Sequence, residues 1–331
     1  GLPVDSEVGT ALNSLGLCGV EAEVSNVELK PGNIPQAFPY QGSKRKLARA
    51  IVECIPPDTD CLIEPFAGSA AISVAAGWLG RARRFWLNDA HAALISLWQR
   101  IIHDPSGLSH DYRRIWEAQH GREREHYNEV RDEFNRTHKP ELLLFLLARC
   151  VKAAIRYNRD GKFNNSPDHR RKGMRPHTME RNIHLVSEIL GTDTKVTNED
   201  YAVVLKDATP DDLVYMDPPY QGVCKDRDSR YVKAVEFDEF VAELHSLNQR
   251  GVPFVVSYDG RTGDKSYGKT LPKELKLEYA ELLVGRSTQA TLLGRNHDTY
   301  ESLYVSEAAI EKLGGLPRSL RPAEQARTLF G

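Results

Sequence analysis

The chain has 331 residues, of which 40% are hydrophobic and 27% are charged. This composition is typical of an ordinary soluble globular protein with one large domain, or with a core domain and a smaller one. The formal net charge is −2, from 44 basic and 46 acidic residues. The overall charge therefore does not indicate a nucleic-acid partner, and any such signal must be local.

The five cysteines are odd in number and form no CxxC pair. This pattern argues against a zinc site or a disulfide framework and favours a reducing cytoplasm. The first 30 residues contain several acids and no long apolar run, so we expect no signal peptide. The longest apolar run, at 142–148, is too short to span a bilayer, and we expect no membrane partner.

Residues 1–35 are weakly periodic and are predicted to be a poorly ordered N-terminal extension. Apolar residues at helical spacing then predict a helix over 44–55, which Pro56 and Pro57 end. The predicted elements that follow are a strand at 61–63, a helix at 69–79, a strand at 84–88 and a helix from Ala90. Strand, glycine-containing turn, helix and strand in this order indicate a nucleotide-type α/β domain with a parallel sheet.

Residues 108–192 interrupt this alternation, because they are predicted to be mainly helical. Strands are predicted again at 195–197, 213–216 and 253–259, with a helix at 237–250 and a late antiparallel hairpin formed by 275–284 and 299–306. The predicted organisation is an extension at 1–35, an α/β domain formed by 36–107 and 193–306, an inserted helical domain at 108–192 and a tail at 307–331.

The turn EPFAGSAA, at 64–71, places an acid at a strand end and small residues where a ligand needs close backbone approach. It is neither a GxGxxG phosphate loop nor a P-loop. A ligand with an amino-acid end and a nucleoside end suits it better than a pyrophosphate. The alternative is a tight strand-to-helix turn in which Ser69 caps the helix.

Two further acids follow predicted strands. Asp89, at the tip of the second strand, is in the position that commonly binds ribose hydroxyls; the alternative is an N-cap for the helix at Ala90. In the tetrapeptide DPPY, the prolines fix the backbone, so that the Asp217 carboxylate and the Pro218 carbonyl can accept from one planar amine. Tyr220 offers a flat face beside them. As an isolated tetrapeptide, DPPY is more often a simple turn.

Together these motifs resemble the Dam-type, D12 class DNA adenine-N6 methyltransferases. The resemblance rests on four motifs in chain order: FPYQGSKRKL (38–47), EPFAGS (64–69), ND (88–89) and DPPY (217–220). The segment RYNRDGKFN (156–164) is also similar to one that those enzymes carry between the two ligand motifs. The resemblance covers about residues 36–306 and implies a Rossmann-like S-adenosylmethionine-dependent methyltransferase sheet, with 108–192 as the DNA-recognition domain.

The resemblance implies a site-specific enzyme that methylates N6 of adenine in duplex DNA. It assigns the cofactor S-adenosyl-L-methionine to Tyr40, Lys44, Glu64, Pro65, Phe66, Ala67, Gly68, Ser69, Asp89, Asp200, Tyr201 and Asp217. Asp200 and Tyr201 match an Asp-aromatic pair beside the cofactor's adenine; the alternative is a capping acid and a core tyrosine. No metal is expected, because the sulfonium methyl is already activated.

The catalytic residues expected from the tetrapeptide are Asp217, Pro218, Pro219 and Tyr220. Two acceptors on the N6 amine favour a more pyramidal nitrogen and stabilise the charge that develops on it. The target base must first be flipped out of the duplex, with Tyr220 stacking on it. In the later polar stretch 257–268, predicted to be a loop, Tyr258 and Asp259 are candidates to line the target pocket.

Nine basic residues and two acids lie between positions 149 and 175, a local charge of +7 suited to DNA phosphates. The expected DNA-binding residues are Arg156, Tyr157, Asn158, Lys162, Phe163, Asn164, Arg170, Arg171, Lys172 and Arg175. An aromatic side chain here is expected to fill the gap left by the flipped base, and the amides to read base edges. The alternative is an ordinary solvated loop.

Three other functions stay open. A cytosine-N4 methyltransferase or a glutamine-amide methyltransferase uses a similar tetrapeptide, because each presents a planar amine. A non-catalytic DNA-binding subunit would keep only the fold; the intact Gly68, Asp217 and Tyr220 argue against it. For the enzyme we expect double-stranded DNA as partner, a cognate restriction endonuclease as a candidate partner, and a bacterial or phage-type location in the cytoplasm, associated with the nucleoid.

Overall fold

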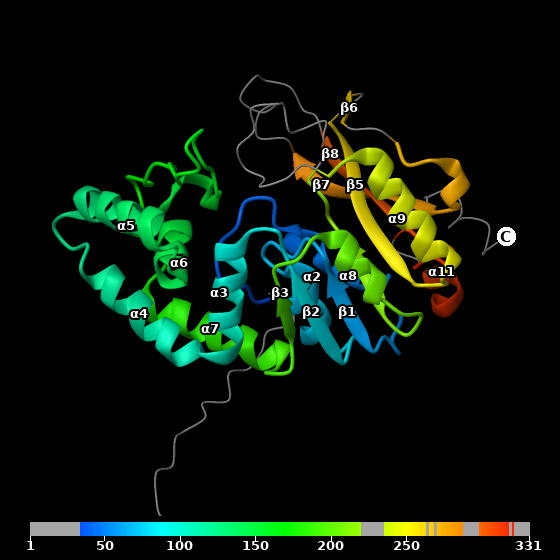
Figure 1. Cartoon of the computed structure of the whole chain (residues 1–331), viewed down its shortest axis with the longest axis horizontal. Helices are drawn as coiled ribbons and strands as arrows, with labels where there is room; N and C mark the ends of the chain where they lie inside the picture. Colours follow the sequence, from blue (N-terminus) through cyan, green and yellow to red (C-terminus); the bar gives the residue numbers. More distant parts are fainter. Residues whose placement is uncertain are drawn as a thin grey trace, which may run out of the picture. The chain divides into compact units, whose positions relative to one another are not determined.

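A computed structural model of the chain describes residues 34–219, 235–262, 265–267, 270–286, 298–317 and 320. Within these ranges, helices flank one mixed sheet (Figure 1). Its strands are β1 (Cys61–Glu64), β2 (Arg84–Asn88), β3 (Lys195–Thr197), β4 (Leu213–Met216), β5 (Phe254–Thr262), β6 (Lys265–Tyr267), β7 (Glu278–Arg286) and β8 (Asp298–Val305).

The order of the strands in the sheet is β3-β2-β1-β4-β5-β8-β7, and β6 pairs with β5. Strands β1 to β5 are parallel, whereas β8 is antiparallel to both β5 and β7. The predicted α/β class and the late antiparallel pair are therefore confirmed. The chain adds β2 and β3 on one side of β1, and then β4 and β5 on the other. In such sheets, ligands bind at the carboxyl ends of the strands where the order reverses, here between β1 and β4.

The helices are α1 (Ala48–Val52), α2 (Ala71–Trp78), α3 (Ala92–His103), α4 (Pro105–Glu117), α5 (Glu123–Thr137), α6 (Pro140–Arg149), α7 (Pro176–Leu190), α8 (Tyr201–Asp207), α9 (Phe237–Gln249) and α11 (Glu307–Leu313). Side chains alternate between the two faces of a strand. On β4, Leu213 and Tyr215 join a core with α1, α2 and α7, while Val214 and Met216 join a second core with α8 and α9. The sheet is thus covered on both faces.

Helices α4 to α7 fall within the predicted helical segment between β2 and β3 (Figure 1). Their buried side chains, including the apolar run of α6, belong to the same core as α1, α2 and one face of the sheet. That shared core, together with α3, holds the segment against the sheet. The run at 142–148 lies in α6, and no helix in the described part of the chain is long and apolar enough to cross a membrane.

Two predictions of local structure were wrong. The helix expected over 44–55 is a 3₁₀ turn, η1 (Lys44–Lys46), followed by the five-residue α1. Ile55 precedes a proline, which disfavours a helical backbone there. Within the expected loop at 257–268, the described residues 257–262 are the end of β5 and residues 265–267 form the short β6, which pairs with β5. The polar composition of this stretch suggested a loop, but backbone pairing is independent of side-chain polarity.

Gly77 lies where α2 packs against α7 and β2. A Cβ at this position would lie 2.6 Å from Ile189 Cγ2 and 3.1 Å from Phe85 Cζ. We expect Gly77→Ala to lower the free energy of unfolding, because overpacking costs about 1–3 kcal/mol and exceeds the gain of about 1 kcal/mol in helix propensity. Urea unfolding of the wild type and the variant tests this; an unchanged or higher midpoint for Gly77→Ala contradicts it.

Candidate active site

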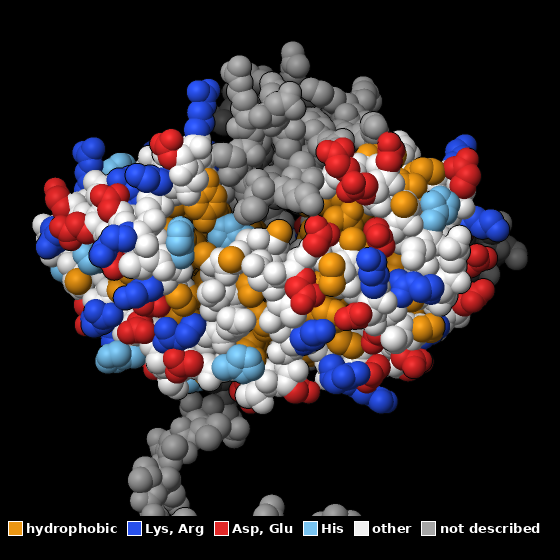
Figure 2. All heavy atoms as spheres, in the orientation of Figure 1, with side chains coloured by type: hydrophobic (Ala, Val, Ile, Leu, Met, Phe, Trp, Pro, Cys, Tyr) orange, Lys and Arg blue, Asp and Glu red, His pale blue; other side chains and the backbone are white. Residues whose placement is uncertain are grey.

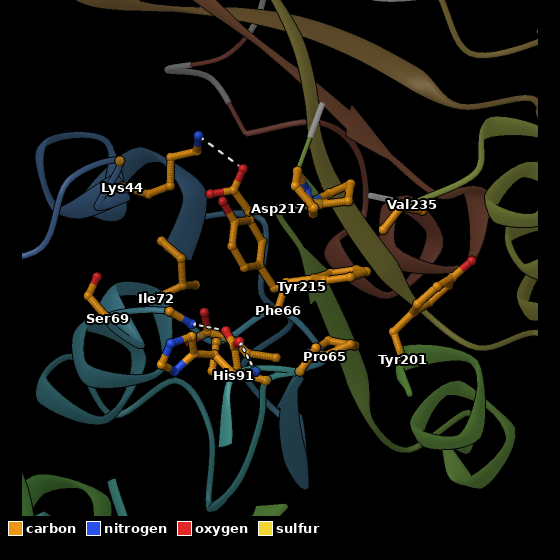
Figure 3. A pocket seen from close by; sticks show the side chains of 18 of the residues that line it. Lys44, Pro65, Phe66, Ser69, Ile72, His91, Tyr201, Tyr215, Asp217 and Val235 are labelled. Atoms are coloured by element: carbon orange, nitrogen blue, oxygen red, sulfur yellow. Dashed lines mark hydrogen bonds and ion pairs between the residues drawn. The ribbon is translucent and has the colours of Figure 1, made fainter. Parts of the chain in front are cut away.

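A cavity of about 610 Å³ lies at the carboxyl ends of β1, β2 and β4 (Figure 3). All twelve residues predicted to surround a cofactor line it, and so do Pro218 and Pro219. Tyr220, the remaining residue predicted for catalysis, lies outside the described residues. Segments that are far apart in the sequence therefore contribute to one pocket, as the order of the motifs suggested.

The turn after β1 brings the backbone close to a neighbouring ring. Gly68 has φ +49°, a left-handed conformation that favours glycine, and a Cβ there would lie 3.3 Å from Cε1 of Tyr40. The Gly68 carbonyl accepts a hydrogen bond from Nε1 of Trp98 at 2.9 Å. Glycine is therefore favoured here both by the backbone conformation and by the close approach of the Tyr40 ring.

The alternative interpretation of this turn, that Ser69 caps α2, was wrong. The residue before α2 is Ala70, also left-handed with φ +46°, and the side chain that accepts from the first turn of α2 is that of Glu64. Ser69 Oγ instead donates to Oγ of Ser43, 2.9 Å away. This hydrogen bond joins the turn to the segment that carries Lys44.

Asp89 is held by two backbone amides. Its Oδ2 accepts from Gly68 N and its Oδ1 from His91 N, both at 2.9 Å. Burial raises the pKa of Asp89. The alternative role as N-cap falls to His91 instead, because His91 Nδ1 accepts from Leu94 N and α3 begins at Ala92 rather than at Ala90.

Glu64, at the end of β1, is 2% exposed, and its Oε1 accepts from Ser73 N in α2 at 2.6 Å. Burial raises the pKa of Glu64 to about 7, although the hydrogen bond from Ser73 opposes the rise. Asn88, before Asp89, is fully buried and contacts Pro65 and Glu199 through its amide. Both side chains fix the walls of the pocket.

The ammonium of Lys44 lies between two carboxylates: Oδ1 of Asp217 at 3.0 Å and Oε1 of Glu301 at 2.7 Å. Figure 3 shows Lys44 and Asp217 directed toward each other. Burial alone would lower the pKa of Lys44, but the two carboxylates outweigh it and raise the pKa. Beside Asp217, the buried Tyr215 shares a hydrogen bond of 2.9 Å with Ser257. Neither Glu301 nor Tyr215 was among the residues predicted from the sequence.

The opposite wall is aromatic and acidic. Phe66 and Tyr201 lie side by side, with ring centroids 5.1 Å apart (Figure 3). Asp200 caps α8, since its Oδ1 accepts from Ala202 N, as the alternative interpretation of this acid proposed. Asp200 and Tyr201 nevertheless also line the cavity. Other residues that line it without having been predicted include His91, Val235, Glu239 and Glu243.

The basic segment, residues 149–175, is only partly available to bind DNA. The side chains of Arg156, Lys162, Asn164, Arg170, Arg171, Lys172 and Arg175 are exposed. Two of these basic side chains already form salt bridges within the protein, Arg171 with Asp168 at 3.0 Å and Lys172 with Glu123 at 2.8 Å. On the face shown in Figure 2, basic and acidic side chains are interspersed over the helical segment.

Phe163 is a correction to the predicted DNA-binding set. It is 1% exposed and packs edge-on against Phe134 and Tyr157 in the core of the helical segment. Its backbone N–H donates to Asn135. Phe163 therefore cannot fill a gap in DNA without unfolding this core. Arg149, counted in the local charge, is also buried and donates to the carbonyls of Asp168 and Arg171.

Tyr157 joins the basic segment to the cavity. Its ring stacks on His91 with centroids 5.5 Å apart, and its hydroxyl lies 2.6 Å from His91 Nε2. Asn158 closes a local turn, because its Oδ1 accepts from the backbone amides of Asp160 and Lys162. The predicted interface and the predicted cofactor site are thus in direct contact through one His–Tyr pair.

The family model for D12 class N6 adenine-specific DNA methyltransferases matches residues 40–286. The chain is 28% identical over 194 residues to the DNA N-6-adenine-methyltransferase of Escherichia phage P1, covering 56% of this chain and 24% of the phage protein. It is 29% identical over 185 residues to the DNA adenine methylase of Serratia marcescens, covering 55% of this chain and 65% of that enzyme.

The chain is also 27% identical over 195 residues to the type II methyltransferase M.CviBI of Paramecium bursaria Chlorella virus NC1A, covering 56% of this chain and 69% of that protein. The chain therefore spans from about a quarter to about two thirds of the length of these curated relatives. Within the described ranges, no cluster of three or more His, Cys, Asp or Glu could hold a metal ion.

Glu64 makes stability depend on pH. Its pKa is about 7 in the folded protein and about 4.5 in the unfolded chain, so the protonated carboxyl stabilises the folded state. This contribution to the free energy of unfolding is fully present below pH 4.5 and is lost as the pH rises to about 7. We expect Glu64→Gln, which retains an acceptor for Ser73 N, to gain stability relative to the wild type between pH 5 and 8, by as much as about 3 kcal/mol. Urea unfolding across this range measures the difference; a difference that is constant with pH contradicts the assignment.

Proposed function

Because the chain belongs to the D12 class of N6 adenine-specific DNA methyltransferases, we propose that it transfers a methyl group from S-adenosyl-L-methionine to N6 of adenine in double-stranded DNA. The observation that carries the proposal is the shared cavity: the turn at 64–69, Asp89 and the start of the DPPY tetrapeptide line one pocket. An activated methyl group bound by the first two would lie next to the acceptors of the third.

The pocket fits such a cofactor in size and in chemistry. Its volume of about 610 Å³ is within the range of about 300–1,000 Å³ for small-molecule sites. We propose that the Asp89 carboxylate accepts from the ribose hydroxyls and that the Phe66 and Tyr201 rings contact the adenine. The other members of the twelve-residue set complete the pocket, and the glycine at 68 leaves room where a side chain would meet Tyr40.

When bound, the cofactor supplies a methyl group activated by its sulfonium. In our proposal, the Asp217 carboxylate and the Pro218 carbonyl accept from the two N–H groups of the adenine amine. These contacts stabilise the positive charge that develops on N6 as the new C–N bond forms and the C–S bond breaks. They also hold the nitrogen in line with the methyl group. The surplus N6 proton leaves to solvent, and Pro219 keeps the two acceptors in register.

The adenine amine is inaccessible inside a duplex, so the base must be flipped into the pocket. We propose that residues 108–192 form the DNA-recognition domain, inserted between the catalytic segments 36–107 and 193–306, and that Tyr220 stacks on the flipped base. With Phe163 removed, the proposed DNA-binding residues are Arg156, Tyr157, Asn158, Lys162, Asn164, Arg170, Arg171, Lys172 and Arg175. An enzyme of this kind acts in the compartment that holds the DNA, so the cytoplasm remains our proposed location.

A cognate restriction endonuclease is a further proposed partner. Relatives of the chain bear the names of type II methyltransferases, among them M.CviBI of a chlorella virus and M1.LlaDCHI of Lactococcus lactis subsp. cremoris. Others bear the name DNA adenine methylase. The names thus divide between type II methyltransferases and DNA adenine methylases.

Methylation should depend on Asp217. We expect Asp217→Asn to lower the single-turnover rate by about 100-fold or more, the usual cost of losing one preorganised charge-stabilising contact. Labelled S-adenosylmethionine and duplex DNA, followed by digestion to nucleosides, locate the label, and Asp207→Asn on the exposed end of α8 is the control. Label in N6-methyl-2′-deoxyadenosine supports the proposal. Label in N4-methyl-2′-deoxycytidine, or none with the wild type, contradicts it.

The exposed Lys and Arg side chains of the basic segment should bind DNA by contacting its phosphates. We expect Arg156→Ala, Lys162→Ala and Arg170→Ala each to weaken binding to any duplex and to reduce the slope of log K against log salt by about 0.9. Fluorescence anisotropy at several salt concentrations measures this. Lys273→Ala, an exposed lysine on η3 (Lys273–Leu275), is the control. An unchanged slope in all three variants contradicts the interface.

A further inference from the structure

We propose that Glu301 is a positioning residue for methyl transfer: it holds the Lys44 ammonium and thereby keeps the Asp217 carboxylate a strong acceptor for the target amine. The inference rests on the proposed function, because it assigns a role in that reaction. Glu301 lies in β8, 84 positions beyond Asp217, and outside every motif that pointed to the site.

The position of Glu301 in its strand is unusual for a charged residue. Side chains two apart in a strand share a face, and Glu301 shares its face with Leu303 and Val305, which are both fully buried in the core. The alternation therefore predicts an apolar side chain at 301. A carboxylate is instead placed at the end of this apolar row, beside Lys44, which lines the cavity.

The neighbours of Glu301 explain the exception. Its side chain is 16% exposed, and Oε1 is 2.7 Å from the Lys44 ammonium, whose side chain is 14% exposed. Burying a charge is costly unless it is paired. Lys44 is already paired with Asp217 at 3.0 Å. One ammonium therefore serves two carboxylates, and the three groups together carry one negative charge.

The sheet is irregular at this point. The pairing of β5 with β8 shifts between Ser257 and Gly260, so that three steps along β5 face two steps along β8, from Leu303 to Glu301. Such bulges bend a strand and redirect side chains, and they are common beside active sites. The irregularity lies where Glu301 leaves the apolar row of β8 and meets Lys44, which indicates a shaped site rather than a stray surface ion pair.

The charge distribution gives Glu301 a consequence for the reaction. An ammonium bound to Asp217 alone would use the lone pairs and the negative charge that the target amine needs. Glu301 draws the ammonium to itself and offsets its charge. Among the described residues, Glu64 and Tyr215 also interact with Asp217 electrostatically. Removing the Glu301 carboxylate takes away one of the two acids that share the Lys44 ammonium, so that this ammonium binds Asp217 more strongly.

The test compares Glu301→Gln and Glu301→Asp with the wild type. We expect Glu301→Gln to lower the single-turnover rate of adenine methylation by about 10- to 100-fold, the range for outer residues that orient a reacting group. The affinity for S-adenosylhomocysteine, measured by calorimetry, should stay the same, because Glu301 does not itself line the cavity. Glu301→Asp, which keeps the charge, should recover part of the rate.

Glu141→Gln is the matched control, because Glu141 is 14% exposed and pairs with Arg100 in the helical segment, away from the cavity. A wild-type rate in Glu301→Gln overturns the inference. So does a rate loss that is matched by weaker ligand binding and a lower thermal midpoint, since that pattern marks a structural role. If the wild type and Glu141→Gln also fail to methylate adenine, the proposed function fails instead.

Discussion

The reversal of strand order between β1 and β4 is the constraint on which the rest of the structure depends. Parallel strands all end at the same edge of a sheet, and a reversal leaves that edge open between diverging connections. The chain places an acid at or just beyond three of these ends: Glu64, Asp89 and Asp217. These three carboxyl groups from strand ends therefore line one cavity, and local contacts must offset their mutual repulsion and the cost of burying them.

Each carboxyl group is compensated in a different way, and the difference fits three roles. Burial shifts Glu64 toward the protonated form near neutral pH, which suits a wall of the pocket. Asp89 accepts from two backbone amides and keeps its orientation toward the cavity. Asp217 is paired with a lysine that a further acid also binds. Asp217, the carboxylate proposed to contact the substrate, is thus the one whose partner, Lys44, is also bound by a second acid.

Local sequence patterns predicted the parallel strands and the late antiparallel pair, because each depends on short-range alternation. The family resemblance pointed to residues that line one cavity, because it rests on compact motifs. Both missed Glu301, since pairing with Lys44 arises only when β8 is placed beside β5. The charged residue in an otherwise alternating apolar strand was the available signal. Phe163 was misassigned because an aromatic residue in a polar stretch looks the same in sequence whether it faces DNA or the core.

The basic segment shows the same limit for charge. Nine basic residues suggested a patch suited to DNA phosphates. Arg149, however, is buried and donates to backbone carbonyls, and Arg171 and Lys172 form salt bridges with acids. Exposure and pairing follow from tertiary contacts rather than from composition. The contact between Tyr157 and His91 was equally invisible in the sequence, because 66 positions separate the two residues.

We propose that one cavity presents a methyl donor to the DPPY acceptors. A crystal structure of the protein with S-adenosylhomocysteine and a duplex containing adenine would show whether it does. We expect the ligand's ribose at Asp89, its thioether sulfur facing Asp217, and an extrahelical adenine whose N6 contacts Asp217 and Pro218. A ligand bound outside this cavity, or an adenine amine held away from Asp217, would contradict it.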